Sequence, residues 1–176
     1  ISNKKFFKYL DKNFLNIINL KSPFIERSIY ESCKIKRFVI EKDEKEKNLR
    51  KILNFGHTFA HGYEAALGYS KKLNHGEAVL LGMSSALKFS YKKKFLKKHE
   101  YLLILNHLAN SKLNLSLKDY FSIKDLNRII SFMMKDKKNS TKKINLIILK
   151  KIGFPIINKE YTNYTIKSYL RKELVN

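Results

Sequence analysis

Three histidines and a glutamate in the middle of the chain have the residue types and spacing of a metal site. His57, His61 and Glu64 fall at positions i, i+4 and i+7, so one helix would carry all three on a single face. His75 follows a predicted turn and begins the next expected helix, and an antiparallel helix pair would bring it alongside His57. At a helix N-terminus the dipole disfavours a protonated imidazole, which stays able to bind a metal at pH 7. Nitrogen ligands from two helices suit Zn²⁺ or a similar divalent ion.

Spacing alone leaves another interpretation open, in which these histidines are hydrogen-bonded core or helix-end residues. Two histidines are too few for a complete metal site. The His-Glu-x-x-His arrangement of zinc proteases is absent, because Thr58 follows His57. His99 and His107 lie in a basic stretch and on a helix face, and we expect neither to have a catalytic role.

Glycine is concentrated in the same part of the chain as these histidines. Inside a helix each glycine costs up to about 1 kcal/mol relative to alanine. Its repeated use favours helix backbones that approach closely, or a ligand that needs room. Five of the six glycines lie within 27 residues: Gly56, Gly62, Gly68, Gly76 and Gly82.

The elements that must position these residues are mostly helical. Hydrophobic periodicity and capping residues predict a mostly α fold, a multi-helix, bundle-like domain with a short β-hairpin near the C-terminus. The predicted helices cover 3–20, a segment from the Ser22–Pro23 start into 41–47, 49–67 ending at Gly68, 76–94 capped by Asn74, 100–109, 123–135 opened by Ser122 and Asp125, and 164–174. The hairpin strands are expected at 144–150 and 154–159, around Gly153 and Pro155.

The chain of 176 residues reads as one unit, 1–176, without internal repeats or a linker. It opens at Ile1 and not at methionine, and runs directly into an amphipathic pattern, so we expect a fragment of a longer protein. The lone Cys33 excludes a disulfide framework and a multi-thiolate metal site. No apolar run approaches the roughly 20 residues of a membrane span, and no secretory signal is visible. We therefore expect a cytoplasmic protein with no membrane partner.

The formal net charge of +22 leaves a basic nucleic-acid-binding module as an alternative, because phosphate neutralisation drives such binding. Only five of the 37 basic residues are arginine, and the lysines are spread over the whole chain. Dedicated nucleic-acid readers rely more on arginine. Lysine, asparagine and isoleucine share A/T-rich codons, so we interpret the charge as compositional drift and expect no nucleic-acid partner.

Several separate motifs together resemble the 3-dehydroquinate synthase family. The residues Asn54-Phe-Gly-His-Thr-Phe-Ala-His-Gly-Tyr-Glu64 and His75-Gly-Glu-Ala-Val-Leu-Leu-Gly-Met83 carry the resemblance. It extends upstream through 33–36, 43–44 and 49–50, and downstream through 134–138, 144–149 and Gly153. The motifs keep their order and spacing over most of the chain. One departure is Tyr63, which is larger than the small or aliphatic residue common in the family.

The resemblance implies a two-domain enzyme of which this chain would be the C-terminal, helical, metal- and substrate-binding domain. The N-terminal α/β domain, which binds NAD, would be absent from this chain, and no glycine-rich strand-to-helix turn is visible here. Three protein ligands hold the family's Zn²⁺ or Co²⁺ ion. His57 and His75 match two of them, and the third is a glutamate in an earlier Glu-x-x-Lys helix motif, which we expect to precede Ile1 in the longer protein. The fragment alone would then be inactive, and the full-length protein would be a homodimer.

The family's substrate is the sugar phosphate 3-deoxy-arabino-heptulosonate 7-phosphate, which is converted to 3-dehydroquinate and phosphate in the shikimate pathway. The resemblance implies catalytic roles for His61, Lys36, Arg50 and Asn54, with His61 close to the reacting centre. It also implies that Lys36, Arg50 and Asn54, together with Lys137 and Lys138, bind the substrate. Glu64 would support a ligand histidine.

Two other enzymes remain as alternatives. A related sugar phosphate cyclase would use the same histidines and NAD on a different precursor. A metal-dependent polyol dehydrogenase is disfavoured by the Gly-His-Thr-Phe and Lys-Asp-Lys-Lys motifs.

Overall fold

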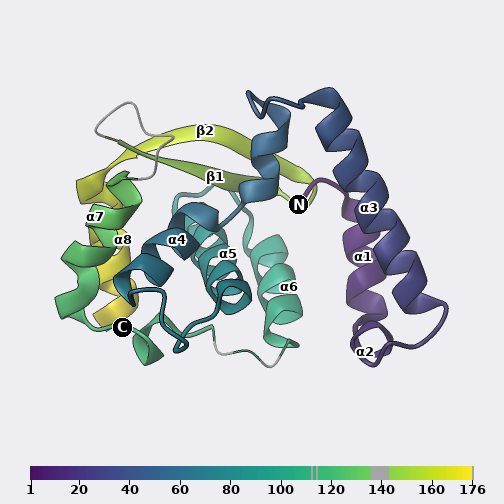
Figure 1. Cartoon of the computed structure of the whole chain (residues 1–176), viewed down its shortest axis with the longest axis horizontal. Coiled ribbons are helices and arrows are strands. Elements are labelled where there is room, and N and C mark those ends of the chain that lie inside the picture. The colour runs from purple at the N-terminus through teal and green to yellow at the C-terminus, as the bar shows by residue number, and fades with distance from the viewer. Residues whose placement is uncertain (112, 114, 136–142, 176) are drawn as a thin grey trace.

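The computed structural model describes residues 1–111, 113, 115–135 and 143–175, and it confirms a mostly α fold with one hairpin. A two-stranded hairpin spans the tops of α4, α5 and α6, with α7 and α8 at one end (Figure 1). A column of α1, α2 and α3 stands at the other end. The helices are α1 Lys4–Lys12, α2 Phe14–Ile18, α3 Phe24–Lys42, α4 His57–Ala66, α5 His75–Lys92, α6 Lys98–Ala109, α7 Leu126–Lys135 and α8 Asn163–Val175. Short 3-10 turns are η1 Leu49–Asn54, η2 Leu117–Asp119 and η3 Ile123–Asp125, and the strands are β1 Lys143–Lys151 and β2 Phe154–Thr162.

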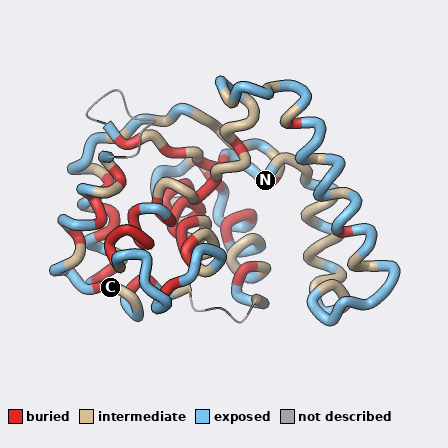
Figure 2. Tube along the Cα trace, viewed as in Figure 1, coloured by how far each residue is buried: buried red, intermediate tan, exposed pale blue. Residues whose placement is uncertain are grey.

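The core lies beneath the hairpin, between α4, α5, α7 and α8, whereas the α1–α3 column is mostly exposed (Figure 2). Neither α1 nor α2 contains a buried residue, and α3 buries only Ser28 and Val39. Phe59 and Tyr63 of α4 and Phe89 of α5 are among the fully buried side chains at the centre. The histidine segment therefore belongs to the part of the molecule that carries the buried core.

The predicted hairpin is confirmed, with antiparallel strands that extend slightly beyond the expected residues. Ile144, Leu146 and Ile148 of β1 alternate inward and are buried, as expected for a strand with one face on the core. Two side chains attach β1 to the helices below it. Ser90 Oγ of α5 accepts a hydrogen bond from the Leu149 amide, and Glu100 of α6 accepts one from the Ile152 amide.

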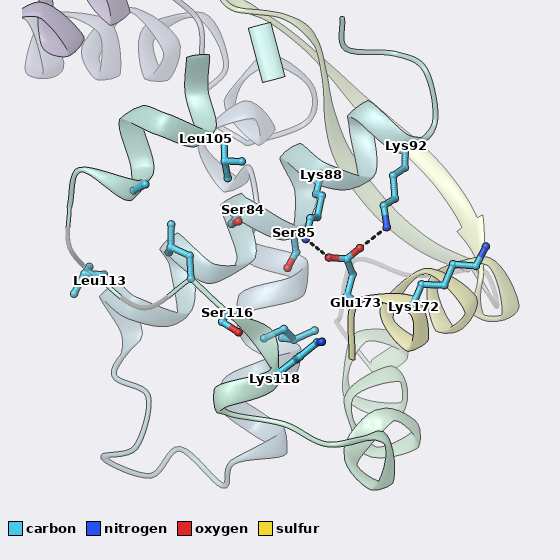
Figure 3. Close-up of a pocket in the computed structure, with 13 residues that line it drawn as sticks. Ser84, Ser85, Lys88, Lys92, Leu105, Leu113, Ser116, Lys118, Lys172 and Glu173 are labelled. Atoms are coloured by element: carbon cyan, nitrogen blue, oxygen red, sulfur yellow. Dashed lines mark hydrogen bonds and ion pairs between the residues drawn. The ribbon is translucent and has the colours of Figure 1, made fainter. Parts of the chain in front are cut away.

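Most capping predictions are confirmed. Asn74 and Glu77 form a complete capping box at the start of α5, and Ser122 with Asp125 forms another before α7. Gly68 follows α4 with a left-handed φ of 64°. Helix α8 joins the core through Glu173, whose carboxylate accepts hydrogen bonds from Lys88 and Lys92 of α5 (Figure 3).

The first two predicted helices are wrong in detail. The helix expected over 3–20 is interrupted at Asn13, whose side-chain amide donates to the Tyr9 carbonyl oxygen and competes with the helical pattern. Ser22 does not cap α3, because the chain enters that helix through the hydrogen bond from the Phe24 amide to the Lys21 carbonyl oxygen. The helix does run into the charged stretch 41–47, as expected, and ends there at Lys42.

The helix expected over 49–67 is also wrong as a continuous element. It consists of η1 and α4, separated by Phe55 and Gly56. Gly56 adopts a left-handed φ of 83°, which breaks the helix and lets α4 begin at His57. The break decides where the first candidate ligand stands.

Candidate metal centre

The two candidate ligand histidines are each the first residue of a helix. His57 begins α4 directly after the Gly56 break, and His75 begins α5 directly after the Asn74 cap. The two helices cross closely at Gly56 and Gly82. A Cβ built on Gly56 would lie 2.5 Å from the Met83 amide nitrogen, so this approach requires glycine. The glycine-rich segment thus serves close backbone packing, as one of the two sequence interpretations expected.

The side chains of His57, His61 and His75 converge. The ring centroids of His57 and His61 are 5.6 Å apart, those of His57 and His75 are 6.2 Å apart, and those of His61 and His75 are 6.4 Å apart. An imidazole nitrogen binds Zn²⁺ at about 2.0–2.1 Å, so two rings at this separation are near enough to face one ion. The predicted approach of His75 to His57 is therefore present in the structure.

Glu64 of α4 contacts the ring of His75 at the start of α5. Its Oε1 lies 3.0 Å from Nδ1 of His75. The Glu64 side chain is only 10% exposed, whereas the His75 side chain is 64% exposed. A carboxylate in this position accepts the Nδ1–H of the ring and leaves Nε2 as the lone-pair nitrogen.

His57 differs from its neighbours in its burial. Its Nδ1 is buried and has no hydrogen-bond partner among the described residues. Burial lowers the pKa of His57, and the nearby rings of His61 and His75 lower it further. The ring is consequently held in the neutral form that can bind a metal.

The donor chemistry of His57 and His75 fits a divalent ion with a preference for nitrogen ligands. No group of three or more His, Cys, Asp or Glu side chains within the described ranges is arranged to hold a metal by itself. The assignment of His57 and His75 as ligands stays a prediction.

Two cavities flank the histidines. One, of about 450 Å³, is lined by Asn54, His57 and His61 together with Lys45, Glu46, Lys51, Thr58, Asn145, Ile147 and Asn158. The other, of about 490 Å³, is lined by His61 and His75 together with Glu64, Ala65, Tyr69, Phe132 and Lys135. His61 lines both, so it stands between a polar, lysine-containing cavity and the Glu64–His75 pair.

Asn54 is the predicted substrate contact that the structure places beside the histidines. Its side-chain amide donates to Oε1 of Glu46 at 2.6 Å within the first cavity. Arg50 is tied to the preceding loop, where Nη1 donates to the Glu44 carbonyl oxygen at 2.7 Å. Arg50 is not among the described residues that line the two cavities.

Lys36 lines a different cavity, between α1, α3 and Leu53. Its role at the histidines stays a prediction. Lys137 and Lys138 lie outside the described residues, although Lys135 of the same motif lines the second cavity.

His107, which was expected to be non-catalytic, is hydrogen-bonded to Asp11 at 3.0 Å and packs against Phe7 and Phe14.

Sequence reasoning missed several residues of the first cavity. Glu46 and Lys51 come from the segment around η1, whereas Asn145 and Asn158 come from the hairpin. Asn158 has a left-handed φ of 56° at a bulge in β2, and its Oδ1 accepts a hydrogen bond from Lys51 Nζ at 3.1 Å. No local motif marks these residues, since the fold alone brings the hairpin over η1.

Comparison of the chain with known proteins shows the family to which it belongs. Residues 1–139 match the family model described as 3-dehydroquinate synthase C-terminal. The chain belongs to this family. It is 56% identical over 174 residues to the 3-dehydroquinate synthase of Pelagibacter ubique. The matched residues make up 99% of this chain and 47% of that protein. It is 41% identical over 155 residues to the 3-dehydroquinate synthase of Dictyoglomus thermophilum, covering 87% of this chain and 41% of the relative. The chain thus spans about half the length of these members of the 3-dehydroquinate synthase family.

Solved structures share the fold. A 2-epi-5-epi-valiolone synthase from Streptomyces hygroscopicus, with NAD⁺ and Zn²⁺ bound, superposes with a TM-score of 0.80 at 16% identity, covering 98% of this chain and 47% of its own. A 2-deoxy-scyllo-inosose synthase complexed with carbaglucose-6-phosphate, NAD⁺ and Co²⁺ superposes with a TM-score of 0.64 at 25% identity. The superposition covers 85% of this chain and 40% of that synthase. No helix within the described residues has the length and apolarity to cross a bilayer.

Proposed function

We propose that this chain is the metal- and substrate-binding part of a 3-dehydroquinate synthase, which converts 3-deoxy-arabino-heptulosonate 7-phosphate to 3-dehydroquinate and phosphate in the shikimate pathway. One observation carries the proposal. His57, His61 and His75 converge between two cavities. They do so in a chain 56% identical to a curated 3-dehydroquinate synthase.

The cofactors proposed are NAD and a divalent metal, Zn²⁺ or Co²⁺, as in the solved structural neighbours. When bound, the metal supplies Lewis-acid polarisation of substrate oxygens and NAD supplies the hydride acceptor. His57 and His75 are the metal ligands from this chain. The third ligand and the NAD contacts are assigned to a part of the longer protein outside this chain, so we propose that the chain alone is inactive.

The remaining site residues bind and orient the substrate. Asn54 contacts its hydroxyl groups from the first cavity, and His61 holds or transfers a proton beside the reacting carbon. Lys36 and Arg50, with Lys137 and Lys138, neutralise the carboxylate and phosphate groups. We propose catalytic roles for His61, Lys36, Arg50 and Asn54, as the family resemblance implies.

A related sugar phosphate cyclase with another substrate is the second candidate. The two solved structures that share this fold are named as a 2-epi-5-epi-valiolone synthase and a 2-deoxy-scyllo-inosose synthase.

We also propose a cytoplasmic homodimer with no nucleic-acid partner. Electrophoretic mobility assays with duplex DNA test the last point, since a nucleic-acid-binding module would bind with a steep salt dependence and be indifferent to chelators.

The decisive experiment replaces the corresponding C-terminal part of the Pelagibacter ubique relative with this chain and measures phosphate release from 3-deoxy-arabino-heptulosonate 7-phosphate. We expect an active chimera that loses its bound divalent ion and its activity in His57→Ala or His75→Ala. The matched control is His99→Ala, an exposed histidine that lines neither cavity. Release from a different sugar phosphate alone would favour the second candidate, and retained metal and activity in both variants would refute the assignment.

A further inference from the structure

The Glu64–His75 pair combines a buried, fixed carboxylate with an exposed ring. Glu64 lies within α4, where its backbone carbonyl oxygen accepts hydrogen bonds from the amides of Leu67 and Tyr69 at 3.2 and 2.8 Å. His75 begins α5, and most of its side chain is exposed. An exposed imidazole on a helix end samples several rotamers, and fixing one requires a partner that does not move. Glu64 is such a partner.

The contact also selects a tautomer. A carboxylate has no proton to donate, so the nitrogen of His75 that faces it must carry the hydrogen. The facing atom is Nδ1, at 3.0 Å from Oε1. The lone pair of the neutral ring is then on Nε2, away from Glu64. A free histidine offers both tautomers, and only one of them presents Nε2 to an ion.

We infer that Glu64 is a positioning residue that fixes the ring orientation and the Nδ1–H tautomer of His75, so that Nε2 is available to the divalent ion. The inference rests on the proposed function, in which His75 is a metal ligand. Carboxylates that accept from ligand histidines raise the basicity of the ligand nitrogen, and their removal typically weakens metal binding about 10–100-fold.

A purely structural ion pair is the competing explanation, and His57 helps to separate the two. The Nδ1 of His57 is buried without a hydrogen-bond partner among the described residues. The chain thus gives a carboxylate acceptor to the exposed ring of His75, whereas the acceptor beside the half-buried ring of His57 is the Phe55 backbone. Placement of the acceptor where orientation is otherwise free is what a positioning role requires.

The test uses the chimera with the Pelagibacter ubique relative described above, in its unmodified form and as three variants. Glu64→Ala removes the acceptor, and Glu64→Gln keeps the shape and a neutral acceptor. Glu77→Gln is the matched control, since Glu77 lies on the first turn of α5, close to His75 in the sequence, but its carboxylate accepts a hydrogen bond from the Asn74 amide. Nitrogen NMR of the His75 ring gives the tautomer without metal. Titration of the chimera, which carries the third ligand, with Co²⁺ followed by visible absorption gives the affinity.

We expect the unmodified chimera and Glu77→Gln to show the Nδ1–H tautomer at His75 and equal Co²⁺ affinity. Glu64→Ala should shift His75 towards the Nε2–H tautomer and weaken Co²⁺ binding about 10–100-fold. Glu64→Gln should keep the tautomer and recover part of the affinity. Urea denaturation of each variant separates this effect from loss of folding.

Two results would overturn the inference. In one, Glu64→Ala leaves the folded state, the tautomer and the affinity unchanged. In the other, the tautomer changes but Co²⁺ binds as before, which makes the pair structural only. If the unmodified chimera binds no Co²⁺ while its His75 keeps the Nδ1–H tautomer, the metal assignment in the proposed function fails, and the metal role of Glu64 fails with it.

Discussion

Gly56 and Gly82 face each other where α4 crosses α5, so closely that neither position has room for a side chain. A Cβ on Gly82 would lie less than 3.0 Å from the Gly56 carbonyl oxygen and 2.8 Å from the Ala60 amide nitrogen. Gly56 also needs its left-handed backbone to begin α4 at His57. This crossing sets the separation of the two helices that carry the histidines.

We predict that Gly82→Ala lowers the free energy of unfolding by about 1–3 kcal/mol, because the added methyl group overpacks a backbone contact. Gly76→Ala is the control within the same helix, since the nearest atom to its new Cβ is Asn74 Oδ1 at 3.7 Å. That variant should be unchanged or more stable by up to about 1 kcal/mol. Urea denaturation followed by circular dichroism measures both, and equal stability of the two variants would contradict the close crossing.

Asp43 gives a pH-dependent prediction. Desolvation raises its pKa, but the backbone amides of Arg50, Asn48 and Lys47, which donate to its carboxylate, outweigh this and lower the pKa below its usual value. A lowered folded-state pKa stabilises the fold above the unfolded value of about 3.9, and this contribution is lost as pH falls through the folded pKa.

Asp43→Asn should therefore lower the urea midpoint at pH 7, and the difference should be smaller at about pH 2, because the contribution of the carboxylate is lost as pH falls through the folded pKa. Glu41→Gln is the control, because Glu41 makes only an exposed pair with Arg37 one helical turn away. A constant difference between the Asp43 variant and the unmodified chain at both pH values would show that the carboxylate charge has no part in holding this loop.

Tyr63 is fully buried, and its hydroxyl is hydrogen-bonded to Ser85 Oγ at 2.8 Å between α4 and α5. Burial raises the pKa of Tyr63, so the hydroxyl stays protonated. We predict that Tyr63→Phe lowers the unfolding free energy by about 0.5–1.5 kcal/mol. A double-mutant cycle with Ser85→Ala measures the coupling, and Tyr69→Phe at an exposed tyrosine should change little. Strict additivity in the cycle would argue against the hydrogen bond.

Glu173 attaches α8 to α5 through two lysines (Figure 3). Its side chain is 9% exposed, whereas those of Lys88 and Lys92 are about 40% exposed. Glu173→Gln should destabilise the chain by about 1–3 kcal/mol, because a charged acceptor of two hydrogen bonds is lost. Lys92→Met should cost less, since Lys88 still pairs with the carboxylate. Thermal unfolding tests this order, and the reverse order would contradict it.

The sequence predicts helices well where side chains cap their own helix. Asn74 with Glu77 and Ser122 with Asp125 bond to backbone atoms three residues away, and this information is local. The breaks at Asn13 and Gly56 were not predicted, because both positions lie inside a continuous hydrophobic pattern. At Gly56 the decisive contact is with Met83, which lies 27 positions further along the chain.

In the candidate site, too, the sequence predicts the contacts between residues close in the chain and not those between distant segments. Convergence of His57, His61 and His75 follows from helical spacing and one turn, and the sequence predicted it. Asn158 and Lys51 meet across 107 positions, and a bulge in β2 aligns them. Spacing cannot predict that contact, because it depends on where the hairpin lies.

The crossing of α4 and α5 has a consequence for the order of folding. The two candidate ligand histidines and Glu64 lie within 19 residues, and the short segment 67–74 joins the two helices that carry them. Closing so short a loop costs little chain entropy, whereas the hairpin must return from far along the chain to cover these helices. We therefore expect the histidine cluster to assemble early, and the polar wall that Asn145 and Asn158 contribute to be added last.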